Sequence, residues 1–197
     1  MHPFRYSPSW RQMIVSVYTI AFGKDRGRDQ FENAFVTWPQ FIAPFVIVVL
    51  IGVALSFVDT PLGSEIKSMP WPRAALVLAI IAVGPMLRFS VAAATVWGIA
   101  RWFAKGERLG VGVLAYLWLQ TALFQPWGYV IRTGVKPQDP WWMIIAFGFV
   151  PAVALLMISG RVLTSALRLG HLGWGLMMFI AAAGAGWLAD FLYGKLL

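Results

Sequence analysis

Five long runs of apolar residues, each ended by charge, proline or tryptophan, constrain this chain more than any other feature. They cover residues 41–58, 74–100, 109–131, 141–160 and 172–189. Each run is long enough to cross a hydrocarbon core of roughly 30 Å as an α-helix. A segment in lipid must satisfy its own backbone hydrogen bonds, and these runs lack strand-like alternation. The sequence therefore predicts an all-α, polytopic membrane protein with about five transmembrane helices in residues 41–197.

The composition supports this class. Of 197 residues, 59% are hydrophobic and 12% are charged, and the mean hydropathy is +0.71. A soluble domain of this size cannot hide so much apolar surface, so membrane lipids must cover part of it. The net charge is +8, and most basic residues flank the apolar runs. We therefore expect anionic lipid headgroups as partners and no nucleic acid.

The basic residues also predict an orientation, because cytoplasmic loops carry an excess of Lys and Arg. Ten lie in the N-terminal segment and in the loops after the second and fourth runs, and five lie in the remaining loops and the C-terminal end. The ten are Arg5, Arg11, Lys24, Arg26, Arg28, Arg101, Lys105, Arg108, Arg161 and Arg168; the five are Lys67, Arg73, Arg132, Lys136 and Lys195. We expect a bacterial cytoplasmic (inner) membrane protein with its N-terminus in the cytoplasm and its C-terminus outside.

Residues 1–40 form a separate, cytoplasmic segment with one amphipathic helix. Ser7 and Pro8 are typical of a helix start. Apolar residues then share one face at helical spacing: Trp10, Met13, Ile14 and Val17. We expect this helix to lie in the cytoplasmic membrane interface. Whether its face docks a partner, senses the membrane, or only covers the inner ends of the bundle stays open.

Arg88 is the most unusual polar residue, since it lies near the middle of the second run. A charge at that depth costs about 2.5–3.5 kcal/mol on insertion scales. Pro85, three residues earlier, removes a backbone donor and is expected to kink the helix. Gln120, in the middle of the third run, is the expected partner, with Tyr116 as a further acceptor. No Asp or Glu occurs inside any run, and Asp190 lies at the outer end of the fifth run, so we expect no carboxylate of this chain at the depth of Arg88.

A second polar position, Gln125 followed by Pro126, repeats the pattern of a polar side chain beside a broken helix. The candidate intramembrane site is therefore Arg88, Tyr116, Gln120 and Gln125. Three interpretations remain open. Arg88 hydrogen-bonds Gln120 and freed carbonyls, or pairs with a carboxylate or lipid phosphate from a partner, or binds an anionic substrate in a transport path.

The chain lacks the residues of common catalytic and cofactor sites. It has no cysteine, two histidines, and no cluster of Asp, Glu or His within the runs. Enzymes and metal sites need such groups close together. We therefore expect no enzyme activity, no metal and no cofactor, and His171 is a weak candidate for ligation because no partner on another run lies level with it.

The chain resembles the bacterial branch of the Yip-type (Ypt-interacting protein) membrane domain. The resemblance rests on an aromatic, proline-bearing N-terminal segment before five closely spaced runs, and on the basic turn 100–110. It also includes Leu117-Trp-Leu-Gln120 and the turn Leu167-Arg-Leu-Gly-His171. The paired-glycine form of the basic turn is absent, because only Gly106 and Gly110 occur there. The resemblance implies a helical membrane domain without known catalysis that acts through partners.

These observations predict a non-enzymatic accessory or scaffolding subunit that acts through protein partners in a larger membrane assembly. One alternative is a small, oligomeric transporter or lipid-handling component with an anion site at Arg88. A second alternative, drawn from 11 Trp and 14 Phe, is a cofactor-contacting subunit of an electron-transfer or light-harvesting complex.

Overall fold

The computed structural model describes residues 9–21, 39–55, 65–66, 68–103, 108–134, 136 and 138–196, and every structural statement below refers to these residues. All their regular elements are helices, so the all-α prediction is confirmed for this part of the chain. The helices are α1 (Trp10–Ala21), α3 (Pro39–Leu55), α5 (Trp71–Phe103), α6 (Leu109–Leu119), η2 (Gln120–Phe124), α7 (Gln125–Gly134), α8 (Trp141–Ile144), η3 (Ile145–Phe149), α9 (Val150–Leu167) and α10 (Leu172–Leu196).

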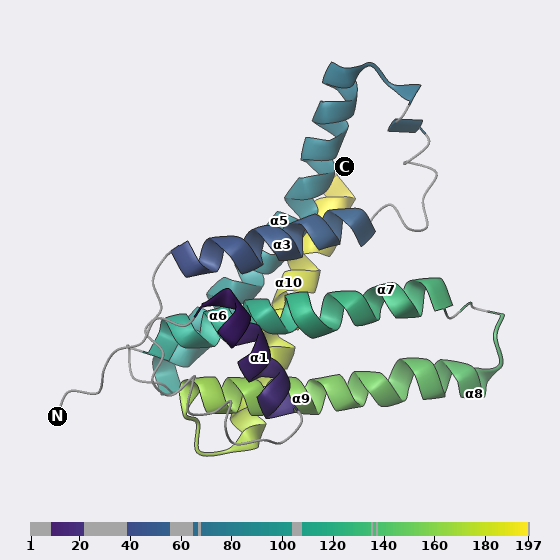
Figure 1. Ribbon diagram of the computed structural model, residues 1–197. Helices are drawn as coiled ribbons and strands as arrows, with labels where there is room; N and C mark the ends of the chain where they lie inside the picture. Colours follow the sequence, from purple (N-terminus) through teal and green to yellow (C-terminus); the bar gives the residue numbers. More distant parts are fainter. Residues whose placement is uncertain are drawn as a thin grey trace.

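Two of the helical runs contain a π-helical turn. The turns η2 and η3 join their neighbours into continuous runs over 109–134 and 141–167 (Figure 1). Each π turn ends two residues before a proline, Pro126 or Pro151. Proline lacks an N–H and clashes with the carbonyl four residues earlier, so a wider turn there relieves both problems.

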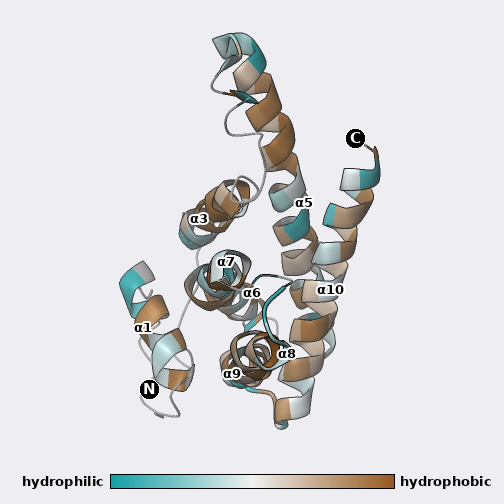
Figure 2. Ribbon diagram, turned by 90° about the vertical axis from the view of Figure 1, so that its right-hand side faces the viewer, coloured by the Kyte–Doolittle hydropathy of each residue, from teal (hydrophilic) through white to brown (hydrophobic). Residues whose placement is uncertain are grey.

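Three helices are long and apolar enough to cross a membrane: Trp71–Phe103, Trp141–Leu167 and Leu172–Leu196. These lengths indicate an integral membrane protein. Figure 2 shows apolar residues along most of α5, α9 and α10, with hydrophilic residues near the free ends of α5 and α10. Crossing by the first and third apolar runs stays a prediction.

The central element of the bundle is α6. Its sequence is apolar all round, which is typical of a helix enclosed on every side. Residues 111–120 are all buried, and α6 packs against α1, α3, α5 and α9. These four helices therefore surround this segment.

The longest packed pair is α5 and α10, which run antiparallel. Near one end, Phe103 and Trp174 have ring centroids 4.5 Å apart, and near the other the Tyr193 hydroxyl donates to the Ile80 carbonyl over 3.0 Å. Between them, a Cβ on Gly186 would come within 2.6 Å of the Arg88 carbonyl oxygen. The absence of a side chain at Gly186 thus allows the two backbones to approach closely, as small residues do in membrane helix pairs.

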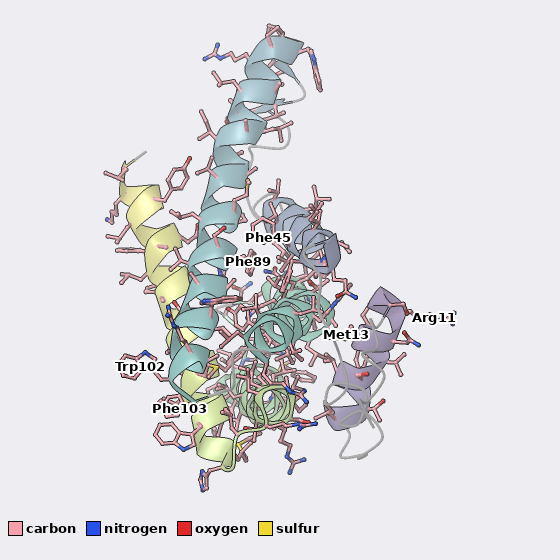
Figure 3. The ribbon with its side chains drawn as sticks, turned by 90° about the vertical axis from the view of Figure 1, so that its left-hand side faces the viewer. Arg11, Met13, Phe45, Phe89, Trp102 and Phe103 are labelled. Carbon is pink, nitrogen blue, oxygen red and sulfur yellow. The ribbon has the colours of Figure 1, made fainter. Side chains whose placement is uncertain are left out.

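The helix α1 begins two residues later than predicted. Ser9 and Gln12 form a capping box, in which the Ser9 N–H donates to Gln12 Oε1 over 2.8 Å and the Gln12 N–H donates to Ser9 Oγ over 3.4 Å. Ser7 and Pro8 lie outside the described residues. Figure 3 shows Met13 pointing from α1 toward the bundle and Arg11 pointing away from it.

Candidate functional site

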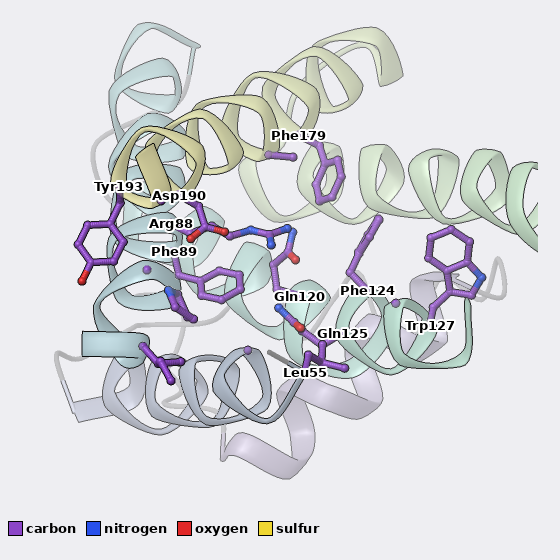
Figure 4. Close-up of a pocket in the computed structure, with 17 residues that line it drawn as sticks. Leu55, Arg88, Phe89, Gln120, Phe124, Gln125, Trp127, Phe179, Asp190 and Tyr193 are labelled. Atoms are coloured by element: carbon purple, nitrogen blue, oxygen red, sulfur yellow. The ribbon is translucent and has the colours of Figure 1, made fainter. Parts of the chain in front are cut away.

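A cavity of about 420 Å³ lies among α3, α5, η2, α7 and α10. Its size falls within the range of ligand pockets. Figure 4 shows polar and apolar side chains pointing into it from several helices. The polar lining residues are Arg88, Gln120, Gln125, Asp190 and Tyr193, and the large apolar ones are Leu55, Ile81, Phe89, Phe124, Trp127 and Phe179.

The π turn η2 brings Gln120 and Gln125 to the same cavity. In an α-helix of 3.6 residues per turn, residues five apart point about 140° away from each other. Here the Gln125 N–H donates to the Gln120 carbonyl, five residues earlier. Such a turn widens the helix and aligns residues five apart. Both glutamines are consequently buried, with exposed fractions of 5% and 6%, and both line the cavity.

A residue of α1 donates a hydrogen bond to a backbone carbonyl of η2. Pro126 has no N–H to offer the Ala122 carbonyl, the group four residues before it. The Tyr18 hydroxyl donates to that carbonyl over 3.0 Å. The N-terminal helix therefore supplies a donor at the turn that shapes the cavity.

Arg88 enters the cavity from α5, half-buried among aromatic and amide groups. Its Cζ lies 5.5 Å from the centroid of the Phe89 ring, a cation–π distance. The side chains of Tyr116 and Gln120 are hydrogen-bonded to each other, and Arg88 is close enough to Tyr116 to act on it electrostatically. Tyr116 is fully buried in α6 behind this group and is not among the lining residues.

Asp190 corrects the expectation that Arg88 has no acidic residue of this chain nearby. The fifth apolar run was expected to end at residue 189, but α10 continues to Leu196. Asp190 therefore lies within the helix, four residues after Gly186 and on the same face, and lines the same cavity as Arg88. In the sequence, Asp190 follows Gly186 by four residues and Tyr193 follows Asp190 by three. Helical periodicity could therefore have placed all three residues on one face of the helix.

The structure thus brings three of the four predicted intramembrane residues, Arg88, Gln120 and Gln125, to one cavity, with the fourth, Tyr116, behind Gln120. The predicted face of α1 lies elsewhere. Met13 and Val17 are buried, Ile14 is partly buried against the core, and α1 packs against α6 and α9. The side chain of Trp10 is outside the described part of the chain.

The cavity offers groups for binding. A guanidinium provides five N–H donors, each amide provides donors and an acceptor, and the carboxylate provides acceptors. His171 is exposed outside the cavity, where its Nδ1 accepts from the Gly173 N–H over 3.0 Å. Within the described ranges, no group of three His, Asp or Glu side chains could hold a metal ion.

Comparison with known protein families, curated proteins and solved structures found no match for this chain. The resemblance to the Yip-type membrane domain therefore stays a prediction.

Proposed function

We propose that this protein is a non-enzymatic, lipid-handling membrane protein whose cavity binds the headgroup of an amphiphilic ligand with an anionic group. The observation that carries the proposal is the convergence of Arg88, Gln120 and Gln125 on one cavity among apolar helices. An ionisable residue inside an apolar bundle is costly, and such residues commonly mark a binding or transport path.

The donors in the cavity match an anionic group. Arginine binds phosphate or carboxylate oxygens through a planar fork of N–H groups. The buried amides of Gln120 and Gln125 can add donors from the opposite wall, since they enter from η2 and α7 while Arg88 enters from α5. A low-polarity surrounding strengthens each of these interactions.

The apolar part of the lining matches a hydrocarbon chain. Phe124 and Phe179 stack with ring centroids 4.8 Å apart, and both face the cavity. Leu55 and Trp127 extend this apolar wall. A ligand with a charged headgroup and apolar tails would therefore meet suitable surface for both of its parts.

The test is lipid binding by the purified full-length protein in mild detergent, measured by titration calorimetry with short-chain phospholipids. In Arg88→Gln, we expect the affinity to fall at least about tenfold, because a hydrogen bond to a charged group contributes about 1.5–3 kcal/mol. Arg73→Gln is the matched control, since Arg73 is exposed at the start of the same helix.

Thermal unfolding of each variant shows whether it is folded. Unchanged affinity in a folded Arg88→Gln protein would remove the basis of the proposal. A similar loss in Arg73→Gln would point to surface electrostatics instead of the cavity.

We further propose the five-span topology in a bacterial inner membrane, with the N-terminus in the cytoplasm. Its support is the bias of basic residues and the presence of a helix in each of the five apolar runs. In this arrangement α1 lies at the cytoplasmic side and covers part of α6 and α9. Its exposed residues, including Arg11 and Val15, would then face the membrane interface.

A second candidate is the accessory-subunit role. Ser90, Ala94 and Gly98 are exposed at four-residue spacing on α5, and small residues at this spacing allow a second membrane helix to pack closely. This role predicts stoichiometric partner subunits, or a second copy of the chain, in affinity purification from mild detergent. Purification as a lone monomer would argue against it.

A further inference from the structure

The cavity carries one acidic side chain as well as Arg88. Asp190 extends from α10 against α5, where its Oδ1 would lie 2.8 Å from a Cβ added to Gly84. Glycine at position 84 therefore makes room for the carboxylate. Gly84 and Arg88 are one helical turn, about 6 Å, apart along the axis of α5, so Asp190 contacts α5 one turn from the residue that carries Arg88.

The two charges decide which headgroups fit. A ligand with only negative charge gains from Arg88 but is repelled by Asp190, and like charges brought together in a binding site disfavour binding. A ligand with both signs of charge satisfies both side chains. Its anionic group would meet Arg88, and its cationic group would meet Asp190.

We infer that the ligand is zwitterionic and carries a phosphate and a primary ammonium group, as a phosphoethanolamine headgroup does. This inference rests on the proposed function and specifies its ligand. It uses Asp190, which the proposed anion site does not need.

A primary ammonium fits the wall near Asp190 better than a quaternary one. It has three N–H donors, and the Asp190 carboxylate is the acceptor on this wall. A trimethylated ammonium has no N–H, so it would pair with Asp190 by charge alone and leave the carboxylate without a hydrogen bond.

The probes are three short-chain lipids with identical tails and different headgroups: phosphatidylethanolamine, phosphatidylglycerol and phosphatidylcholine. Each is titrated into the full-length protein in mild detergent. Free phosphoethanolamine, which has the same charges without tails, is a fourth probe. We expect phosphatidylethanolamine to bind at least about tenfold more tightly than the other two lipids. Weaker binding of free phosphoethanolamine would assign the site to a lipid, and equal binding would assign it to a soluble ligand of the same chemistry.

The decisive variant is Asp190→Asn, which has nearly the same shape without the charge. We expect it to lose the preference for phosphatidylethanolamine and to bind phosphatidylglycerol more tightly than the unaltered protein does. Glu65→Gln removes the same charge from an exposed position and should change neither affinity.

The outcomes separate the two proposals. If phosphatidylglycerol binds as well as phosphatidylethanolamine and Asp190→Asn changes nothing, while Arg88→Gln still weakens binding, the zwitterion inference is wrong and the proposed function stands. If no probe binds, or if binding is indifferent to Arg88→Gln, the proposed function itself is wrong. If Asp190→Asn unfolds, the preference among the three lipids in the unaltered protein still decides the inference.

Discussion

At the scale of single residues, the contact between Tyr18 and Ala122 links parts of the chain that are 104 positions apart. Pro126 removes the donor that an α-helix would give to the Ala122 carbonyl, and the Tyr18 hydroxyl takes its place. This hydrogen bond lies at the surface, with Tyr18 exposed and Ala122 partly buried, so we expect it to contribute as an ordinary hydrogen bond between neutral groups does. The proline and the tyrosine therefore form one structural unit.

We expect Tyr18→Phe to lower the free energy of unfolding by about 1 kcal/mol, the usual worth of one hydrogen bond. In a Pro126→Ala background, an N–H returns near Ala122 and the same substitution should cost less, so the two changes should couple in a double-mutant cycle. The measurement is reversible unfolding in mixed detergent. Tyr129→Phe, at an exposed hydroxyl, is the control, and additive effects of Tyr18 and Pro126 would contradict the idea.

At the scale of helices, the pairing of α5 with α10 depends on glycine. A methyl group at Gly186 would lie 2.6 Å from the Arg88 carbonyl oxygen and 3.1 Å from the Ala92 Cβ, whereas one at Gly184 would meet nothing within 4 Å. The two glycines lie two residues apart on the same helix, one facing α5 and the other facing outward. Substituting alanine at Gly186 tests the packing of the two helices, and substituting alanine at Gly184 tests helix propensity alone.

Gly186→Ala should destabilise the protein by about 1–3 kcal/mol, because added volume in a packed interface forces the backbones apart. It should also weaken ligand binding, since it displaces Arg88 relative to Asp190. Gly184→Ala should leave stability unchanged or raise it, as alanine is the better helix former. The measurement is the thermal unfolding of both variants and the unaltered protein in the same detergent. Equal stability of the two variants would show that close approach of the helices is not required.

At the scale of the whole molecule, the bundle is built around α6. Residues 111–119 of this helix are all buried. This arrangement agrees with a helix whose sequence is apolar all round. It also means that the surface toward lipid comes from other helices. Among their exposed large residues are Trp141, Trp142, Phe149, Trp187 and Leu192.

The five-span topology makes a direct prediction for reporter fusions. A phosphatase that is active only outside the cytoplasm should be active when fused after residue 137 or at the C-terminus. A fluorescent protein that folds only in the cytoplasm should report after residues 105 and 170. If the fusions after residues 105, 137 and 170 all report from the cytoplasm, the third and fourth runs do not cross; if only the fusion after residue 137 does, the proposed orientation is inverted.

The sequence determined the all-helical class, the apolar runs and the choice of Arg88, Gln120 and Gln125 as the polar residues of interest. These follow from local properties: length, hydropathy and the position of prolines. Asp190 was expected at the outer end of the fifth run, which ends at residue 189. The helix continues past the apolar run to Leu196, because a helix need not end where its apolar residues end. Sequence reasoning also did not foresee the π turn, since proline predicts a disturbed helix without specifying its form.

Only the tertiary structure decided what shares the cavity. Asp190 reaches it because Gly84 leaves space on a helix about a hundred residues earlier, and both glutamines reach it because a π turn changes the angle between them. The apolar face of α1 likewise turned out to pack on α6 and α9. Helical periodicity defines the faces of each helix from sequence, but which faces meet depends on the close packing of residues far apart in the chain.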